Sequence, residues 1–407
     1  MRTIPAPPAG PWLTGGRVRP APSRYLGDMP ETPPPSLPGG PFADGLAAAA
    51  LAGRPLDADD GLRVLTDPTL DAFALAHAAY RVRHHHFGRG VQVHILNNAQ
   101  NGRCPEDCSY CTQAKTSDAD IEPYPIKHEQ EVLDEAGRAY DAGAHRYCMV
   151  FSGRGPTEKR TEQLAGYVRA VKQKYPSLEV CVSAGLLDDE KAEVLKLAGL
   201  DRLNHNLNTS RARYGDICTT HTYDDRLRTL LSAKKAGLQT CSGLIAGMGE
   251  SPAELVELAL TLAELEAESI PVNFLLPFEG NVLDTPHGLT PAYCLRILCL
   301  FRFANPSADV RIAAGREYHL RGLEALGLLP ANSLFLDGYL NGRGAERRRT
   351  YALIADGGFE LVGDHAVDTL LGTLPEEDGR ADPTERSCLT REGVAIKSMA
   401  ELRPAKG

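Results

Sequence analysis

The regular alternation of two kinds of segment across residues 91–356 constrains the fold of this chain more than any other feature. Short segments rich in Val, Ile and Phe favour strands, and the longer segments between them carry apolar residues at helical spacing. Alternating strands and helices form parallel βαβ units, because each helix returns the chain to the edge where the next strand begins. Eight segments are predicted as strands: residues 91–96, 146–151, 179–184, 201–207, 239–245, 269–276, 309–314 and 332–338.

A helix is predicted after each of these strands, and one more precedes the first. The eight following helices are expected at residues 128–142, 158–175, 188–198, 222–236, 251–267, 290–303, 316–326 and 343–356, and the preceding one at 69–87. Eight strand–helix pairs match an α/β fold of the TIM type, a (β/α)8 barrel. A doubly wound open sheet shows the same alternation, and periodicity alone does not separate the two.

The two ends of the chain differ in composition from this central part. Twelve of the 29 prolines lie in the first 43 residues, and proline both fixes φ and removes a backbone donor, so residues 1–45 are predicted to be a disordered Pro-rich extension. Residues 46–365 are expected to form the barrel domain. After residue 365 the sequence turns polar and acidic, which predicts a flexible tail over residues 366–407.

The bulk composition argues against several classes of protein. The formal charge is −9 without a basic stripe, so a nucleic-acid partner is not expected. No apolar run approaches the roughly 20 residues of a membrane helix, and the N-terminus lacks the apolar core of a secretory signal. Ten cysteines in 407 residues are too sparse for a disulfide scaffold. We therefore expect a cytoplasmic protein whose clustered cysteines serve metal or redox chemistry.

Three of the cysteines follow the first predicted strand in the segment NGRCPEDCSYCTQAK. Cys104, Cys108 and Cys111 have C-x3-C-x2-C spacing, and three thiolates on one loop can hold three irons of a [4Fe–4S] cluster while the fourth iron stays open. A zinc site is the alternative, but it needs a fourth ligand, and the nearest histidines in the sequence are His94 and His128. The position after a strand adds weight, because such loops form the active sites of barrels.

Three further cysteines and one arginine lie within predicted strands. Cys148, Cys181 and Cys241 belong to the second, third and fifth strands, and Arg311 belongs to the seventh. A buried cysteine alone is often only a small apolar residue, but a buried arginine needs a partner, because its desolvation costs several kcal/mol. These four side chains could meet only inside a barrel, which predicts a second, deeply buried metal cluster. The remaining cysteines are predicted to serve packing or to lie in the tail: Cys218, Cys294, Cys299 and Cys388.

Amide side chains recur in the same strands. Asn204, Asn206 and Asn208 follow a period of two, so they are expected on one side of a strand, and Asn273 stands alone in an apolar segment. Buried amides must form hydrogen bonds, so these side chains are candidates for binding a ligand. The alternative is a turn at the end of the strand, where asparagine is common.

The C-x3-C-x2-C loop resembles the signature of the radical S-adenosylmethionine superfamily. Within it, the segments RCPEDCSYC, RYCMV, CVSAG, LNHNLNTS, TCSGLIAGMGE and RIAAGRE, in this order and spacing, closely resemble the biotin synthase family over residues 62–360. The resemblance implies that a [4Fe–4S] cluster cleaves S-adenosylmethionine, and that sulfur is inserted into dethiobiotin to give biotin. No side chain is then expected to act as an acid or base, because the clusters and the deoxyadenosyl radical carry the chemistry.

The resemblance also implies roles for individual residues. Cys148, Cys181, Cys241 and Arg311 would bind an auxiliary [2Fe–2S] cluster that donates the sulfur. Tyr110, Asn206, Asn208 and Ile245 would bind S-adenosylmethionine, and Asn204, Asn206 and Asn273 would contact dethiobiotin. The expected partners are an electron donor such as flavodoxin or ferredoxin and a second copy of the chain in a homodimer. Three other interpretations compete with this one: a related radical enzyme with another substrate, a non-catalytic iron–sulfur protein, and a zinc-stabilised barrel.

Overall fold

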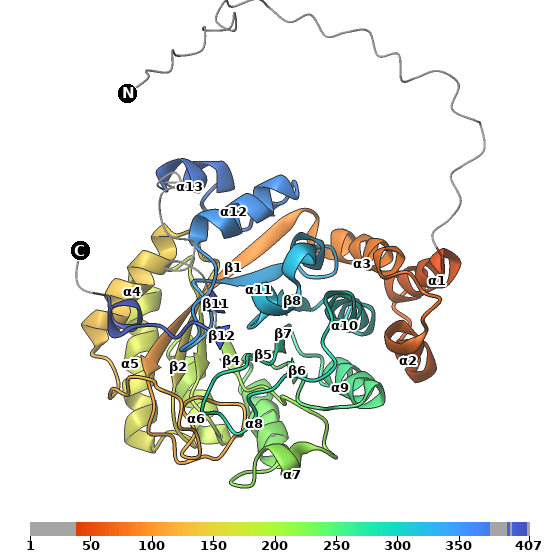
Figure 1. Ribbon diagram of the computed structural model, residues 1–407. Coiled ribbons are helices and arrows are strands. Elements are labelled where there is room, and N and C mark those ends of the chain that lie inside the picture. The colour runs from red at the N-terminus through yellow and green to blue at the C-terminus, as the bar shows by residue number, and fades with distance from the viewer. Residues whose placement is uncertain (1–37, 375–388, 391–392, 405–407) are drawn as a thin grey trace, which may run out of the picture. The chain divides into compact units, whose positions relative to one another are not determined.

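The computed structural model describes residues 38–374, 389–390 and 393–404. Its centre is a closed barrel of parallel strands surrounded by helices (Figure 1). The eight strand positions are filled in chain order, and the first strand pairs with the last through Gln92–Ile95 and Ser333–Leu336. This closure confirms the predicted (β/α)8 barrel and excludes the open sheet. The strands are β1 (Gly90–Gln100), β2 (Arg146–Phe151), β3 (Glu179–Ser183), β4 (Arg202–Asn204), β5 (Gln239–Cys241), β6 (Leu244–Ala246), β7 (Ser269–Phe274), β8 (Asp309–Ile312) and β9 (Ser333–Leu336).

The fifth strand position is divided between β5 and β6, where one continuous strand was expected. The break falls at Ser242 and Gly243, and a Cβ atom on Gly243 would lie 2.0 Å from the Pro271 carbonyl oxygen. Only glycine permits this approach between neighbouring backbones. A short additional strand, β10 (Glu360–Leu361), extends the sheet beside the start of β1.

Helices follow the strands around the barrel (Figure 1). Several begin at a residue whose side chain accepts a hydrogen bond from the first turn, as Thr157, Thr222 and Ser251 do. The helix expected at 316–326 is shorter, because Arg321 has a positive φ of 48° and two 3₁₀ turns follow α11. The helices of the barrel are α4 (Glu129–Asp141), α5 (Glu158–Lys174), α6 (Asp189–Leu197), α7 (Tyr214–Ile217), α8 (Tyr223–Lys235), α9 (Pro252–Glu264), α10 (Pro291–Ala304), α11 (Arg316–His319) and α12 (Arg347–Asp356).

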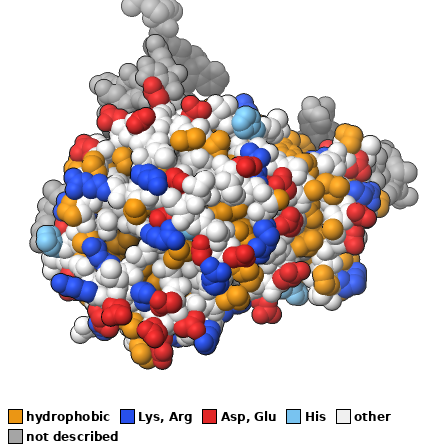
Figure 2. Space-filling view, turned by 90° about the horizontal axis from the view of Figure 1, so that it is seen from below, with side chains coloured by type: hydrophobic (Ala, Val, Ile, Leu, Met, Phe, Trp, Pro, Cys, Tyr) orange, Lys and Arg blue, Asp and Glu red, His pale blue; other side chains and the backbone are white. Residues whose placement is uncertain are grey.

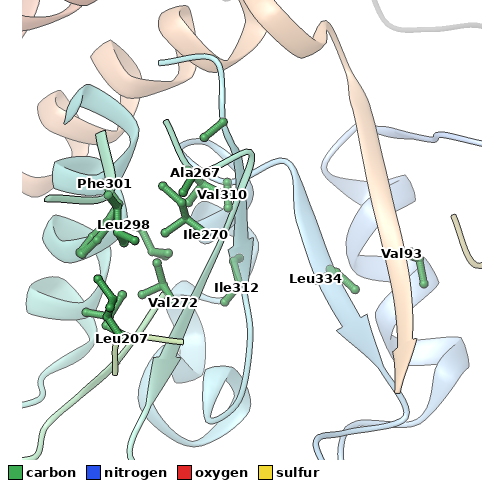
Figure 3. Close-up of a cluster of buried hydrophobic side chains, with 14 of the residues drawn as sticks. Val93, Leu207, Ala267, Ile270, Val272, Leu298, Phe301, Val310, Ile312 and Leu334 are labelled. Atoms are coloured by element: carbon green, nitrogen blue, oxygen red, sulfur yellow. The ribbon is translucent and has the colours of Figure 1, made fainter. Parts of the chain in front are cut away.

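The apolar core lies between the outer face of the barrel and these helices. Leu298 and Phe301 of α10 pack against Val310 and Ile312 of β8 and against the neighbouring strand β7 (Figure 3). Because side chains alternate along a strand, Asp309 and Arg311 of the same strand face the inside of the barrel. The core therefore surrounds an interior that carries polar and ionisable groups.

The ends of the described chain pack against the barrel. Before it come α1 (Gly40–Leu51), α2 (Ala58–Thr66) and α3 (Ala72–Phe87), and α3 confirms the helix predicted ahead of the first strand. After it come α13 (Val367–Thr373), the strand pair β11 (Leu389–Thr390) and β12 (Gly393–Val394), and α14 (Met399–Leu402). Residues 1–37 of the predicted extension, together with 375–388, 391–392 and 405–407, lie outside the described residues.

Residues 394–404, here called the C-terminal strap, hold the loop that follows β9. The Arg343 amide donates to Ala395 (2.8 Å) and the Lys397 amide donates to Asn341 (2.8 Å). The Lys127 ammonium donates to the Leu402 carbonyl (2.6 Å). A flexible tail was predicted for these residues from their polar composition, which does not exclude hydrogen bonds to the barrel.

Acidic and basic side chains are interspersed over the face of the molecule shown in Figure 2. Among the helices of the described chain, none is both long and apolar enough to cross a lipid bilayer.

Candidate active site

A cavity with about 1160 Å³ of space, partly open to solvent, lies where the barrel strands end at their carboxyl side. Eleven of the thirteen residues predicted for binding line it, and these come from the cysteine loop, from seven strands (β2 to β8) and from the segment that follows β4. The exceptions are Cys104 and Cys108. The predicted residues in the wall are Tyr110, Cys111, Cys148, Cys181, Asn204, Asn206, Asn208, Cys241, Ile245, Asn273 and Arg311.

The loop that carries Cys104, Cys108 and Cys111 is folded by its own backbone. The Cys104 amide donates to the Gln113 carbonyl (3.2 Å), and the Cys111 amide donates to the Cys108 carbonyl (3.0 Å). Gly102 turns the chain out of β1 with a φ of 71°. The loop is also attached to the far side of the barrel mouth, because the Ser109 amide donates to the Ile217 carbonyl (3.0 Å).

The thiols of this loop are free and hard to ionise in the protein alone. Burial raises the pKa of Cys104, and it raises that of Cys111 to about 11. The pKa of Cys108 is raised by its contact with the Cys218 thiol and by burial. Three such thiols on one loop, of which Cys111 reaches the cavity, fit a group that brings positive charge to them. The residues present therefore fit a [4Fe–4S] cluster held at three corners.

The strand cysteines lie side by side deeper in the barrel. Cys148 and Cys181 are direct partners in the register of β2 and β3, and Cys241 pairs with Asn204 in β5 and β4. All three are at most 6% exposed. The Cys181 thiol contacts both of the others, which raises its own pKa well above the usual range and lowers that of Cys148 and Cys241. The predicted convergence of these cysteines inside the barrel is confirmed.

Arg311 meets the same thiols from β8. Its Nη1 lies 3.7 Å from Cys241 Sγ, and its Nη2 donates to Ser269 (2.6 Å) and to Asp309 (3.1 Å). Its Nε atom is buried without a hydrogen-bond partner, although Arg311 is only 1% exposed. An unpaired guanidinium nitrogen beside three buried thiols fits a further, anionic group at this position. The donor set thus accommodates the auxiliary cluster implied by the resemblance.

A buried ion network supports Arg311 from below the thiols. Asp309 pairs with Arg311 and also with Arg146 (3.1 Å), and Arg146 pairs with Glu179 (2.6 Å). Burial by itself would raise the pKa of Asp309, but the neighbouring Arg311, His94 and Arg146 hold it well below its usual range. Arg202 also lies 3.5 Å from Glu179, so the network brings three arginines to two carboxylates, of which Asp309 is the more deeply buried.

Arg146 and His94 lie beneath the strand thiols. Arg146 is fully buried and does not reach the wall of the cavity, because Glu179 and Asp309 hold its guanidinium. His94 contacts Arg146 (3.2 Å) and lies 3.9 Å from Asp309, so it reaches Arg311 only through that carboxylate.

The amide side chains occupy the next level of the cavity. Asn204 donates to Asn206 Oδ1 (3.2 Å) and lies 3.3 Å from Cys241 Sγ. Although β4 ends at Asn204, Asn206 and Asn208 still face the cavity, and Asn208 does so with a φ of 70°, which asparagine tolerates. Asn273 donates to the Leu244 carbonyl (2.8 Å) and accepts from the Ala314 amide (3.1 Å).

Tyr110 and Ile245 form an apolar edge of the cavity beside the cysteine loop. Both pack with Ile217, Met248 and Leu275. The Tyr110 hydroxyl accepts hydrogen bonds from Asn208 and from Arg226, the latter at 3.3 Å. The edge therefore combines a flat apolar surface with amide groups, which suits a nucleoside.

Four residues at or near the site were not predicted to contribute to it. Asp309 could have been found, because Arg311 required a buried partner and residues two apart share a face of a strand. His205 lines the cavity, and its Nε2 is buried without a hydrogen-bond partner. Strand alternation predicts that its side chain points away from the cavity, but this pattern does not apply because β4 ends one residue earlier. Arg226 of α8 and Cys218 reach the cysteine loop from more than 100 residues away, and no local pattern signals such a contact.

Two family models match the chain. The Radical SAM superfamily matches residues 101–262, which include the cysteine loop, and the Biotin and Thiamin Synthesis associated domain matches residues 271–360. The structure is also similar to solved structures. Methylornithine synthase aligns with a TM-score of 0.67 at 19% identity over 81% of this chain and all of the other. The FeFe-hydrogenase maturase from Carboxydothermus hydrogenoformans aligns with a TM-score of 0.66 at 18% identity over 81% of each chain. At these identities the likeness concerns the fold.

Sequence relatives are much more similar. A biotin synthase of Magnetococcus marinus is 57% identical over 314 residues, which are 77% of this chain and 98% of the relative. A biotin synthase of Acaryochloris marina is 54% identical over 75% of this chain and 88% of its own, and one of Bacillus subtilis is 43% identical over 78% and 94%. The chain therefore belongs to the biotin synthase family of radical S-adenosylmethionine enzymes.

Proposed function

We propose that this chain converts dethiobiotin to biotin by inserting sulfur in two radical steps driven by S-adenosylmethionine. The observation that carries the proposal is that one cavity is lined by both cysteine sets. Cys111 of the loop and the strand residues Cys148, Cys181, Cys241 and Arg311 face the same space, with amide side chains between them. A radical made at the loop would thus meet its substrate beside a sulfur source without passing through solvent.

The roles of the cysteines follow from their positions. Cys104, Cys108 and Cys111 would hold the [4Fe–4S] cluster, and Cys148, Cys181, Cys241 and Arg311 would hold the [2Fe–2S] cluster. When bound, the first supplies the electron that cleaves S-adenosylmethionine and the second supplies the sulfur atom. Asp309 and Ser269 would orient Arg311 toward the second cluster, because both accept hydrogen bonds from its Nη2.

S-adenosylmethionine would lie against the edge of the cavity formed by Tyr110 and Ile245, with its adenine on their apolar surface. Asn206 and Asn208 would bind the ribose hydroxyls. The Asn208 backbone is fixed on both sides, because its amide donates to Gly243 and its carbonyl accepts from Ile245, both at 2.9 Å. The side chain is therefore oriented before the cofactor arrives, which lowers the entropy lost on binding.

Dethiobiotin would occupy the space between this edge and the strand thiols. Its polar ureido ring can be bound by Asn204, Asn206 and Asn273, and its aliphatic chain by the apolar lining at Leu96, Val150 and Phe335. Apolar walls also exclude water, which protects radicals and keeps the electrostatic contacts strong.

An external one-electron donor such as flavodoxin or ferredoxin is required by this proposal, and the active form would be a homodimer. A cytoplasmic location fits the site, because thiol ligands need a reducing compartment. All nine cysteines in the part of the chain that the structure describes are free thiols. The proposed division of the chain is an extension (residues 1–45), a barrel domain (46–365) and a polar C-terminal tail (366–407), although α1 already begins at Gly40.

An anaerobic turnover with dethiobiotin, S-adenosylmethionine and a chemical reductant tests the proposal. We expect biotin and 5′-deoxyadenosine, quantified by mass spectrometry, and the same products from Cys299→Ala, a buried cysteine of α10 outside the cavity. Formation of 5′-deoxyadenosine without biotin would refute the substrate and retain the radical chemistry. Such a result would favour the related radical enzyme with another substrate.

A further inference from the structure

A second group of ligands stands directly beside the cysteine loop. Cys218, in the segment between α7 and α8, has its Sγ 3.7 Å from Cys108 Sγ and 3.3 Å from His221 Nδ1. The three residues are buried, at 8% exposure or less. Among the described residues, Cys108, Cys218 and His221 are the one group of three Cys, His, Asp or Glu ligand atoms that all lie within 4.8 Å of one another.

These distances match those of a single tetrahedral ion. Two thiolates at about 2.3 Å from a zinc ion, separated by the tetrahedral angle, lie about 3.8 Å apart, and a thiolate and an imidazole nitrogen lie about 3.5 Å apart. The observed separations of 3.7 and 3.3 Å are close to these values, and the third pair, Cys108 Sγ and a His221 ring nitrogen, lies within 4.8 Å. Cys104 and Cys111 do not belong to this compact group, as expected for ligands that would span a larger cluster.

The surroundings also orient the histidine. Arg226 Nη2 lies 2.9 Å from Nε2, and because a guanidinium only donates, Nε2 accepts and the ring proton lies on Nδ1, which donates it to the buried Glu106 carboxylate (2.5 Å). Nδ1 is also the nitrogen nearer to Cys218 Sγ, so a cation at Nδ1 would shift the ring proton to Nε2 and displace Arg226 from it. Glu106 would keep negative charge beside the bound cation.

The group lies apart from the cavity of the proposed reaction, because none of the three residues lines it. It approaches the surface instead. Arg154, whose side chain is 52% exposed, contacts Glu106, and the Thr219 side chain binds Asp107 at an exposed position. An ion from solvent could thus reach Cys218 without entering the substrate cavity.

We propose that Cys108, Cys218 and His221 bind one divalent d-block cation of zinc-like softness in the cluster-free chain. Mixed thiolate and imidazole ligands select such ions, and water fills the fourth position. Each thiol releases its proton to solvent when the cation binds. Because Cys108 is shared, the bound cation and the [4Fe–4S] cluster exclude each other, so the site makes cluster loading sensitive to competing metal. The inference concerns the cluster-free chain and does not depend on the sulfur-insertion proposal.

Cobalt(II) is the direct probe, because thiolate ligation gives it intense near-ultraviolet and visible absorption. Anaerobic titration of the full cluster-free chain is expected to show one more Co²⁺ per chain than the same titration of Cys218→Ala. The absorption of this site should be lost in Cys218→Ala. In His221→Ala the Co²⁺ affinity should fall at least about tenfold, which is equivalent to 1.4 kcal/mol. The double variant Cys104→Ala/Cys111→Ala should keep this absorption. An unchanged spectrum in Cys218→Ala, or its loss in the double variant, would overturn the proposal.

A measurement on the unmodified chain covers the case in which a variant does not fold. Zinc should protect Cys108 and Cys218 from alkylation by iodoacetamide about tenfold or more, while Cys104 stays as reactive as without metal. Protection of Cys104, Cys108 and Cys111 without Cys218 would assign the ion to the loop alone and refute the site. Zinc-loaded chain should also take up iron and sulfide more slowly than zinc-treated Cys218→Ala, and equal rates would contradict the exclusion.

Discussion

Replacing Asp309 by asparagine should disturb both the stability and the loading of the barrel interior. Asp309 is 4% exposed and pairs with Arg146 and Arg311, each at 3.1 Å. Asparagine keeps the shape and can still bind Ser269 and Ser333, so the loss is one of charge. Arg146 retains Glu179, whereas Arg311 has no other carboxylate partner within the described residues. The substitution therefore leaves one buried cation uncompensated.

The expected cost is about 3–5 kcal/mol, the usual range when one partner of a buried ion pair is removed. At about 2 °C per kcal/mol for a large domain, the melting temperature of the cluster-free Asp309→Asn chain should fall by about 6–10 °C. Circular dichroism measures this shift. Iron and sulfide analysis after anaerobic reconstitution should show loss of the auxiliary cluster with the [4Fe–4S] cluster retained, because only Arg311 loses its orientation.

Two comparisons make this result specific. Asp224→Asn removes one charge from an exposed pair with Arg211, and such pairs contribute about 0–1 kcal/mol, so its melting temperature should move by less than about 2 °C. Adding Arg311→Met to Asp309→Asn removes the stranded charge and should recover part of the lost stability. An Asp309→Asn chain that melts like the parent and binds the same amount of iron would refute the role given to the ion network.

Three further predictions concern acid stability, the strap and the substrate pocket. Cationic neighbours lower the pKa values of Asp309 and Glu179, so the stability that these carboxylates contribute is present above their unfolded-state pKa of about 4 and is lost as the pH falls further. The urea midpoint of the cluster-free chain should therefore drop between pH 5 and pH 3, and a flat profile would contradict this. A chain that ends at residue 392 lacks the strap and loses its two backbone hydrogen bonds to the loop around Asn341, which lines the cavity. The KM for dethiobiotin should then rise about tenfold, whereas an unchanged KM would show that the strap does not position this loop. Asn273→Ala removes the hydrogen bonds of the Asn273 side chain to the Leu244 carbonyl and the Ala314 amide. Equilibrium dialysis should show dethiobiotin affinity weakened by at least about tenfold, whereas unchanged affinity would show that Asn273 does not contact the substrate.

The strands and the positions of the cysteines that converge on the cavity could be predicted because the necessary information is local. A strand that is apolar on both faces predicts a parallel barrel. The same strands contain Cys148, Cys181, Cys241 and Arg311, and a charged or reactive side chain in such a strand indicates a binding role. Once a barrel was assumed, these side chains could meet only inside it. The closed register of β1 with β9 confirms that assumption.

The features that could not be predicted depend on contacts between distant parts of the chain. The division of the fifth strand arises where Gly243 approaches the Pro271 carbonyl, and Cys218 approaches Cys108 across 110 residues. The contacts of the strap could not be predicted because its sequence is polar. Backbone hydrogen bonds and ion pairs hold it on the barrel, and such contacts produce no apolar periodicity in the sequence. Asp309 is the case that sequence reasoning could have included, since it lies two residues before Arg311 on one strand face.

The central claim is that two cysteine sets with separate tasks face one cavity. Parallel anaerobic assays of Cys104→Ala and Cys181→Ala test it most directly, with 5′-deoxyadenosine and biotin measured in the same samples. Cys104→Ala should form neither product, because the loop loses a ligand of the cluster that cleaves S-adenosylmethionine. Cys181→Ala should still form 5′-deoxyadenosine but no biotin. Equal loss of both products in the two variants would contradict the separation of tasks on which this account of the site depends.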